Sequence, residues 1–277
     1  MSETTYPRVA VLGGAGTIGT TVISALRGAG WPADRIVAAG RTAARLETVA
    51  AEFGVEVTTD AADAVTGADV VVTSVKPQDM RALLTQIASA VSADALVLTV
   101  AAALPSSFYE DLLAPGTAVV RSMPNTPSRL GKGATSISAG AHATEEHMAL
   151  AERILAGTGL VARVPEDQIA GVSVVSGSGP AFFYAVAEAM AAAGMANGLD
   201  RELAEALAAQ TLIGAGALLE ESGETPAELR AKVSSKGGTT LAALAAMESA
   251  GLQGVFSAGA NAAIARAREL GEELQRG

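Results

Sequence analysis

The chain has 277 residues, of which 49% are hydrophobic and 3% aromatic, and its formal net charge is −10. This length predicts two domains, and the acidic balance argues against a nucleic-acid partner, because phosphates require a basic protein face. Cysteine is absent, which excludes a disulfide framework, a thiol nucleophile and a thiolate metal site.

The first residues, Met1–Tyr6, carry neither the basic flank nor the apolar run of a signal peptide. Charged residues interrupt the longest apolar stretches, Asp94 near Leu96 and Glu188 near Phe182. No stretch is therefore expected to reach the roughly 18 apolar residues that a membrane span needs. We expect a soluble, cytoplasmic protein.

Short β-branched runs alternate with helical segments up to about residue 164, as in right-handed βαβ units with a buried parallel sheet. His142 and His147 fall in a polar, Glu-containing stretch that indicates a solvated helix start rather than a metal site. The predicted strands are Val9–Leu12, Ile36–Ala39, Val55–Thr58, Val70–Val75, Leu96–Val100 and Val119–Arg121, with Ser136–Ser138 and Leu160–Val164 as two further candidates.

After Pro165 the pattern becomes helical, with breaks at Gly, Pro and Ser. Pro180 suits the first turn of a long helix, Asp200 is a candidate cap for the next, and Gly223 ends that one. This segment is rich in small residues and too thin for a stable globule, so we expect a second copy to complete it. The sequence thus predicts a fold of the α/β class, with a Rossmann-type, doubly wound, mostly parallel sheet in residues 1–164 and an all-helical dimerisation domain in residues 165–277.

A glycine fingerprint, G-x-G-x-x-G, occupies Gly14–Gly19 between the first predicted strand and the helix that follows. In this context the first glycine permits a tight turn, Gly16 lets the backbone approach a pyrophosphate, and Gly19 lets the helix pack on the strand. The helix amino terminus then faces the phosphates. The predicted phosphate-binding residues are Gly14, Ala15, Gly16, Thr17, Ile18 and Gly19.

The end of the second predicted strand indicates which nicotinamide cofactor binds. An NAD site usually carries Asp or Glu there, to bond the ribose hydroxyls. Here the chain reads Gly40-Arg-Thr42, followed by Arg45. Arg41 can bind a 2′-phosphate bidentately and Thr42 can donate a hydrogen bond, so NADPH is favoured and NADH remains possible. The alternative is that both arginines merely form a solvated helix start.

A second glycine loop, Val233–Thr240, precedes an apolar helical stretch. Free backbone amides at such a helix start can bind an anion. The hydroxyls of Thr239 and Thr240 can cap the helix or contact a ligand, and on the local sequence alone capping is the better interpretation.

Four motifs occur in the order seen in pyrroline-5-carboxylate reductases, and the chain resembles that family from about Arg8 to Leu270. The motifs are Val75-Lys-Pro-Gln78, Arg121-Ser-Met-Pro-Asn-Thr-Pro127, Val175-Ser-Gly-Ser-Gly-Pro-Ala181 and Gly237-Gly-Thr-Thr240. The resemblance implies reduction of L-1-pyrroline-5-carboxylate to L-proline with NAD(P)H. It also implies a homodimer built by interlocking helical domains, an active site where the two domains meet across that dimer, and in many members a pentamer of dimers.

The resemblance also implies roles for individual residues, and no metal among them. Thr240 matches the position that contacts the ring nitrogen of the substrate, and we assign it to orientation and proton relay from water. The implied cofactor contacts are Val75, Lys76 and Pro77 on the nicotinamide-ribose side and Ala101, Ala102 and Asn125 near the nicotinamide. The implied substrate-binding residues are Val233, Ser235, Gly237, Gly238, Thr239 and Thr240.

Two positions depart from the family pattern. Lys236 replaces the usual proline of the second loop, and Ala103 replaces a glycine close to the nicotinamide. Losing the proline raises the ordering cost of the loop, and a methyl group at Ala103 restricts its backbone angles. Two alternatives therefore stay open: a paralogue that reduces another cyclic imine, and a non-catalytic NADP-binding regulatory protein.

Overall fold

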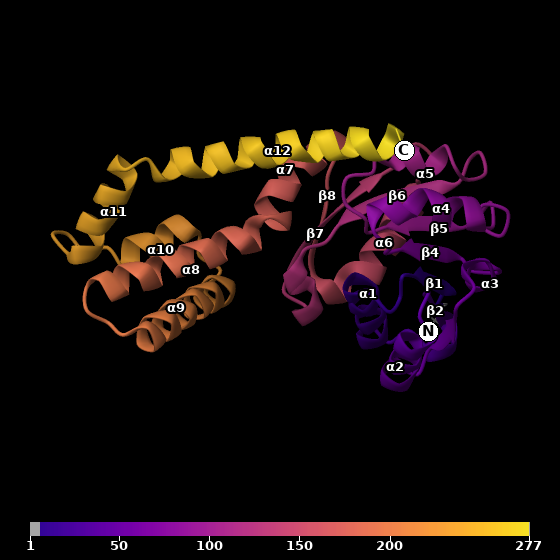
Figure 1. The fold of residues 1–277 in the computed structure, drawn as a ribbon, viewed down its shortest axis with the longest axis horizontal. Helices are drawn as coiled ribbons and strands as arrows, with labels where there is room; N and C mark the ends of the chain where they lie inside the picture. The colour runs from indigo at the N-terminus through magenta and orange to yellow at the C-terminus, as the bar shows by residue number, and fades with distance from the viewer. Residues whose placement is uncertain (1–5, 277) are drawn as a thin grey trace. The chain divides into compact units, whose positions relative to one another are not determined.

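The structure, a computed structural model, describes residues 6–276 (Figure 1). The chain forms two compact units, one of Met1–Gly177 with Ile264–Gly277 and the other of Ser178–Ala263. The sheet-bearing unit thus extends beyond residue 164, where the sequence changes character, because the segment after Pro165 packs back against the sheet. The division at 164/165 remains a prediction about the functional domains.

An eight-stranded sheet with the order β3-β2-β1-β4-β5-β6-β7-β8 organises the first unit. All neighbouring strands are parallel except β6 and β7, so the doubly wound, mostly parallel sheet expected from the sequence is confirmed. The strands are β1 (Val9–Leu12), β2 (Ile36–Ala39), β3 (Glu56–Thr58), β4 (Val70–Thr73), β5 (Leu96–Thr99), β6 (Ala118–Met123), β7 (Gly133–Ala139) and β8 (Gly159–Arg163).

Helices cover both faces of this sheet (Figure 1). The helical elements of the first unit are α1 (Thr17–Gly28), η1 (Ala33–Arg35), α2 (Ala43–Phe53), α3 (Ala61–Val65), α4 (Pro77–Ile87), α5 (Ser106–Glu110), η2 (Thr126–Leu130), α6 (Glu145–Leu155), η3 (Ala156–Thr158), η4 (Glu166–Gln168), α7 (Ile169–Val172) and the π-helix η5 (Ser173–Gly177). Val9 and Val11 of β1 pack in the core beneath α1, α2 and α6, and Ala10 and Leu12 pack on the opposite face beneath α3, α4 and α5. Burial on both faces explains why β1 is continuously apolar.

The strand order places a topological switch point at β1, which pairs with β2 on one side and β4 on the other. Open α/β sheets bind ligands at the carboxyl ends of their strands at such a point. The loops that follow β1, β2 and β4 therefore position any ligand of this unit.

The second unit consists of helices: α8 (Gly179–Ala196), α9 (Arg201–Ser222), α10 (Pro226–Lys232), α11 (Thr239–Ser249) and the first part of α12 (Leu252–Arg276). The expected caps are present. The Asp200 side chain accepts a hydrogen bond from Leu203 N, and Gly223 ends α9 in the left-handed conformation.

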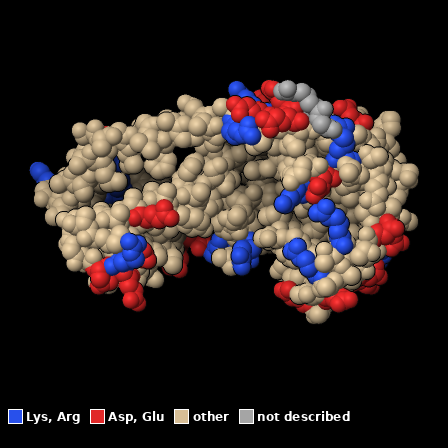
Figure 2. Space-filling model, in the orientation of Figure 1, with Lys and Arg blue, Asp and Glu red and all other residues tan. Residues whose placement is uncertain are grey.

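The helices of the second unit bury few of their own apolar side chains. Their described core cluster contains Ala191, Ala204 and Ala208, whereas Phe183 is 59% exposed and Ile213 is 62% exposed. Figure 2 shows a mostly uncharged surface over these helices. Exposed apolar patches of this kind mark contact sites for another protein or for a membrane.

The expectation that no apolar stretch is long enough to span a membrane is wrong. Glu166–Ala196 and Arg201–Ser222 are both long and apolar enough by length and composition, and α11 with α12 joins them if that bent pair counts as one span. The sequence argument failed because one acidic residue, Glu188, does not offset the surrounding Ala, Phe, Val and Met.

Candidate functional site

The glycine turn between β1 and α1 is tightly built. Gly16 N donates to Gly13 O over 2.8 Å, and Gly13 has a φ of 81°, a left-handed angle that favours glycine. The tight turn therefore depends on Gly13, which the G-x-G-x-x-G pattern does not include. Gly14 follows within the same turn, where an added Cβ would lie 2.9 Å from Val11 O.

Gly14 and Gly19 are also needed for close packing. A Cβ on Gly14 would lie 2.7 Å from Ala38 Cβ on β2, and one on Gly19 would lie 2.4 Å from Gly13 O. A Cβ on Gly16, by contrast, would have a single close neighbour, Gly13 O at 3.1 Å. The backbone at Gly16 thus stays open on the side where a pyrophosphate can approach.

A cavity of about 480 Å³ opens at the carboxyl ends of β1, β2 and β4. It is lined by the glycine turn, by the loop after β2 and by the first turns of α4, which together make the crevice expected at the switch point. The lining residues are Leu12, Gly13, Ala15, Gly16, Ala39, Gly40, Arg41, Thr42, Arg45, Thr59, Ala61, Ser74, Val75, Lys76, Gln78, Asp79, Ala82, Leu83 and Gln86.

The structure brings part of the predicted cofactor set together in this cavity. Ala15, Gly16, Arg41, Thr42, Val75 and Lys76 line it. Other predicted residues lie beside it on the same elements without lining it, namely Gly14, Thr17, Ile18 and Gly19 around the start of α1 and Pro77 at the start of α4. Ala101, Ala102 and Asn125 lie after β5 and β6, outside this cavity's lining.

The two arginines after β2 differ in what they contact. Arg45 Nη2 donates to Ala15 O over 2.8 Å and so braces the glycine turn. The Arg41 side chain is 88% exposed and forms a 3.4 Å ion pair with Asp79. Arg41 is therefore the more available guanidinium for a phosphate group. Sequence reasoning missed Asp79, although it falls in the first turn of α4, directly after the Val-Lys-Pro-Gln motif.

The loop after β5 is fixed at its beginning by buried hydrogen bonds. Thr99 Oγ1 donates to Tyr109 Oη over 2.6 Å and accepts a bond from Ala101 N, while Ser122 Oγ donates to Thr99 O. Burial raises the pKa of Tyr109 to about 12, against a smaller opposing effect of the Thr99 hydrogen bond. The Tyr109 hydroxyl therefore stays protonated at neutral pH, and Ala101 is held at a fixed place.

Glu166 holds the end of this loop that precedes α5. It is another residue that sequence reasoning missed. Its carboxylate accepts from Ser106 N at 2.8 Å and pairs with Arg121 Nη1 at 3.1 Å. Burial acts to raise the pKa of Glu166, but the hydrogen bonds from Ser106 and the charge of Arg121 outweigh it and lower the pKa. Glu166 is thus ionised at neutral pH and anchors the amino terminus of α5.

Between these anchors, Ala103 adopts a φ of 72° and is alone among the described non-glycine residues in having a positive φ. The restriction expected from its methyl group is therefore present as backbone strain. Replacing Ala103 by Gly is expected to raise the free energy of unfolding by about 1 kcal/mol, because glycine tolerates this angle.

Urea denaturation of the two proteins measures this change. Ala102→Gly is the matched control: its φ is not positive, so it is expected to lower stability by about 0.5–1 kcal/mol. If both variants lost the same stability, Ala103 would not be strained.

Asn125 connects the sheet to the π-helix. Its Nδ2 donates to Ser176 O and its Oδ1 accepts from Ala134 N, both at 3.0 Å. Both ends of the amide group thus hold η5 against β7. A π-helix of this kind often marks a functional site. The contact of Asn125 with the nicotinamide remains a prediction.

The second glycine loop lies in the second unit, before α11. Gly238 N donates to Ser235 O over 2.9 Å and Gly237 has a φ of 75°, so Ser235–Gly238 forms a β-turn with Lys236 at its second position. Proline is favoured at that position, so its replacement by Lys236 is expected to raise the cost of ordering the loop.

The predicted substrate residues cluster around this turn. Val233 is 64% exposed, and Ser235, Gly237, Thr239 and Thr240 are also exposed. Gly238 caps α11 without a side-chain hydrogen bond, so the expectation that threonine hydroxyls cap the helix is wrong. Thr239 and Thr240 begin α11 instead, which leaves both hydroxyls available to a ligand.

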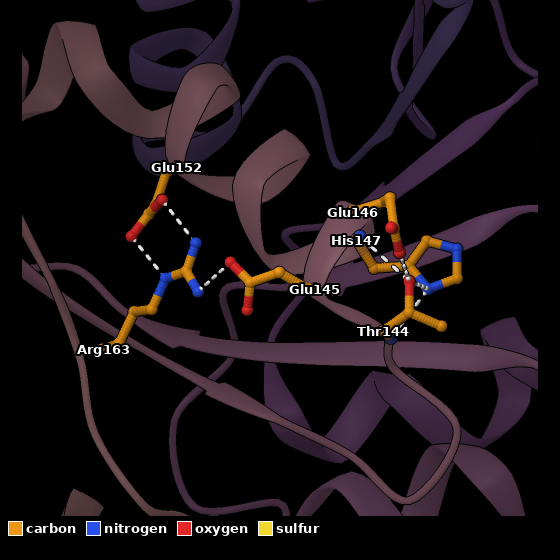
Figure 3. Close-up of polar contacts among 6 residues, drawn as sticks. All are labelled: Thr144, Glu145, Glu146, His147, Glu152 and Arg163. Atoms are coloured by element: carbon orange, nitrogen blue, oxygen red, sulfur yellow. Dashed lines mark hydrogen bonds and ion pairs between the residues drawn. The ribbon is translucent and has the colours of Figure 1, made fainter.

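The helix start expected around His147 is confirmed (Figure 3). Thr144 N donates to His147 Nδ1 over 3.1 Å, and the two residues form a capping box at the start of α6. Figure 3 also shows Arg163 of β8 bound to Glu145 and Glu152 of α6, with Arg163 Nε 2.7 Å from Glu152 Oε1. These contacts join α6 to the sheet and lie apart from the cavity lining.

Comparison with known proteins gives matches over nearly the whole chain. Residues 166–270 match the family model described as pyrroline-5-carboxylate reductase dimerisation. Residues 8–103 match the model described as NADP oxidoreductase coenzyme F420-dependent. The pyrroline-5-carboxylate reductase of Pseudomonas aeruginosa is 39% identical over 269 residues, which cover 97% of this chain and 98% of that protein.

Solved structures give the same result. A pyrroline-5-carboxylate reductase from Coxiella burnetii superposes with a TM-score of 0.90 at 33% identity, covering 96% of this chain and 99% of that one. The pyrroline carboxylate reductase of Plasmodium falciparum, solved with NADP bound, has a TM-score of 0.80 at 21% identity over 96% and 98% of the two chains. At that identity it supports the fold alone.

Proposed function

The chain belongs to the pyrroline-5-carboxylate reductase family, and from that premise we propose that its own residues reduce L-1-pyrroline-5-carboxylate to L-proline with NADPH. The observation that carries this proposal is the 39% identity over 97% of the chain to such an oxidoreductase. The cavity at the switch point fits a dinucleotide, because Gly14 and Gly19 permit close packing and Gly16 leaves the backbone accessible.

We assign cofactor binding to the first unit. Backbone amides at the start of α1 face the pyrophosphate, and Arg41 with Thr42 receives the 2′-phosphate. Val75, Lys76 and Pro77 follow β4 and support the ribose, and the fixed loop at Ala101 and Ala102 supports the ring. When bound, the nicotinamide supplies the hydride.

We assign substrate binding to the second unit. Amides around Ser235 and Gly237, next to Val233 and Thr239, hold the carboxylate of the cyclic imine, while Gly238 N closes the turn by donating to Ser235 O. A C=N bond accepts hydride best when its nitrogen is protonated, so the ring nitrogen must receive a proton before or during the transfer. The Thr240 hydroxyl orients that nitrogen and relays a proton from water.

The assignment of Arg41 can be tested directly. Arg41→Ala is expected to weaken NADPH binding by about tenfold to a hundredfold, since charged hydrogen bonds are worth about 1.5–3 kcal/mol. NADH lacks the 2′-phosphate, so its affinity should stay within about twofold. Fluorescence titration with both cofactors measures this difference, and equal losses for the two would refute the assignment.

A homodimer formed by the second unit follows from its exposed apolar helices and from the match to a dimerisation model. Sedimentation of the purified protein tests this part of the proposal. A pentamer of dimers and a cytoplasmic location remain predictions from the sequence.

The reaction itself is tested by NADPH oxidation with L-1-pyrroline-5-carboxylate, compared with NADH and with pyrroline-2-carboxylate. Rapid turnover of the first substrate supports the proline-forming role and makes Lys236 and Ala103 tolerated changes. Turnover of pyrroline-2-carboxylate alone would indicate a shifted specificity. If no cyclic imine is reduced, the non-catalytic alternative applies.

A further inference from the structure

The cofactor cavity contains one acidic side chain among its described lining residues, Asp79 in the first turn of α4. Its neighbours in that lining include the basic residues Arg41, Arg45 and Lys76. Asp79 Oδ2 lies 3.4 Å from Arg41 Nη2, and the Asp79 side chain is 40% exposed. The acid therefore faces the guanidinium to which the 2′-phosphate is assigned.

This ion pair affects the two cofactors differently. A 2′-phosphate must displace Asp79 from Arg41 or share the guanidinium with it, and the two anions repel each other at short range. NADH carries a hydroxyl at that position and does not meet this repulsion. A carboxylate is moreover the group that bonds ribose hydroxyls in NAD sites.

The loop after β2 supplies no other acid and no second free arginine. The chain there reads Gly40-Arg-Thr42, and Arg45 is hydrogen-bonded to Ala15 O. Discrimination between a phosphate and a hydroxyl at this end of the cavity thus depends on the balance between Arg41 and Asp79, which come from different crossover connections of the sheet.

We propose that Asp79 is a specificity-determining residue that lowers the preference of this protein for NADPH over NADH by competing for Arg41. This inference rests on the proposed function, because it assumes that the cavity binds a nicotinamide dinucleotide. It adds a residue that the glycine fingerprint and the loop after β2 do not include.

The test is Asp79→Asn, which keeps the size of the side chain and removes its charge. The ratio of the NADH dissociation constant to the NADPH dissociation constant is expected to rise by about fivefold, a size typical of a partly exposed charge pair. Asp94→Asn is the control, because Asp94 is exposed, lies outside the cavity lining and changes the net charge equally. An unchanged or lower ratio in Asp79→Asn would overturn the proposal.

A double-mutant cycle with Arg41→Ala tests whether Asp79 acts through Arg41. In that background, Asp79→Asn is expected to change the ratio by clearly less than in the wild-type background, because the direct repulsion remains and the competition for Arg41 is gone. A full effect without Arg41 would contradict the proposed competition.

Titration with 2′,5′-ADP and 5′-AMP separates this inference from the catalytic proposal. The same fivefold change is expected in the ratio of their dissociation constants, about 1 kcal/mol, because these two probes differ at the 2′ position and cannot transfer hydride. If the wild-type protein reduces no cyclic imine, the proposed function fails while this ratio still tests Asp79. If the imine is reduced and the ratio does not move, the Asp79 proposal alone fails.

Discussion

Replacing Gly19 by Ala is expected to lower the free energy of unfolding by about 2–3 kcal/mol and to abolish NADPH binding. The added Cβ would lie 2.4 Å from Gly13 O and 2.8 Å from Gly14 Cα. Both atoms belong to the backbone of the glycine turn, so they cannot move aside as a side-chain end can. Either α1 is displaced from the turn or the turn itself is distorted, and both changes disrupt the phosphate site.

Gly28→Ala is the matched control for this prediction. Gly28 ends the same helix, and a Cβ there meets no atom within 4 Å. The control is expected to leave stability unchanged or to raise it by up to about 1 kcal/mol, because alanine favours helix more than glycine does. Urea denaturation and NADPH titration of both variants measure the contrast. Equal stability of the two variants would show that α1 does not depend on close approach at Gly19.

Replacing Thr240 by Ala is expected to lower kcat by about a hundredfold, or about 2.7 kcal/mol. The affinity for NADPH should stay within about twofold, because the cofactor is assigned to the other unit. Thr240 is an exposed residue in the first turn of α11, and the Gly238 cap of that helix has no side-chain hydrogen bond. Loss of the hydroxyl should therefore leave the helix intact.

Two further variants show whether the Thr240 hydroxyl is the group responsible. Thr240→Ser retains the hydroxyl and is expected to keep most of the turnover, whereas Thr239→Ala removes the neighbouring hydroxyl and should have a smaller effect. Steady-state kinetics with the cyclic imine measure kcat for all three variants. An equal loss in Thr240→Ser, or a parallel loss of NADPH binding in Thr240→Ala, would assign Thr240 to the fold instead.

Much of the fold could be predicted from local sequence. The strands fall within one or two residues of their predicted bounds in most cases, because a strand buried on both faces must be continuously apolar. The predicted strand Val70–Val75 is two residues longer than β4, which ends at Thr73. Val75 is a typical strand residue, but it follows Ser74, whose hydroxyl donates a hydrogen bond to Leu12 O. Asp200 and Gly223 were predicted correctly, because helix caps depend on a few adjacent residues.

The cavity could be predicted only in part. The glycine turn and Arg41 were found because they follow predicted strands at fixed spacings. Asp79 and Glu166 were missed, because their partners lie on other segments of the chain. Neither residue has a local signal that distinguishes it from a solvated acid.

The sequence by itself determined the parallel sheet, the position of the cofactor-binding turn and the family resemblance. Each of these depends on neighbouring residues or on short motifs. The tertiary structure alone decided that Gly13 takes the left-handed angle and that Arg45 donates to a carbonyl 30 residues away. It also decided that Glu166 holds Ser106 across 60 residues. The physical reason is that backbone preferences act over a few neighbouring residues. Contacts between side chains far apart in the sequence depend instead on the crossover connections, because these bring the ends of distant strands together.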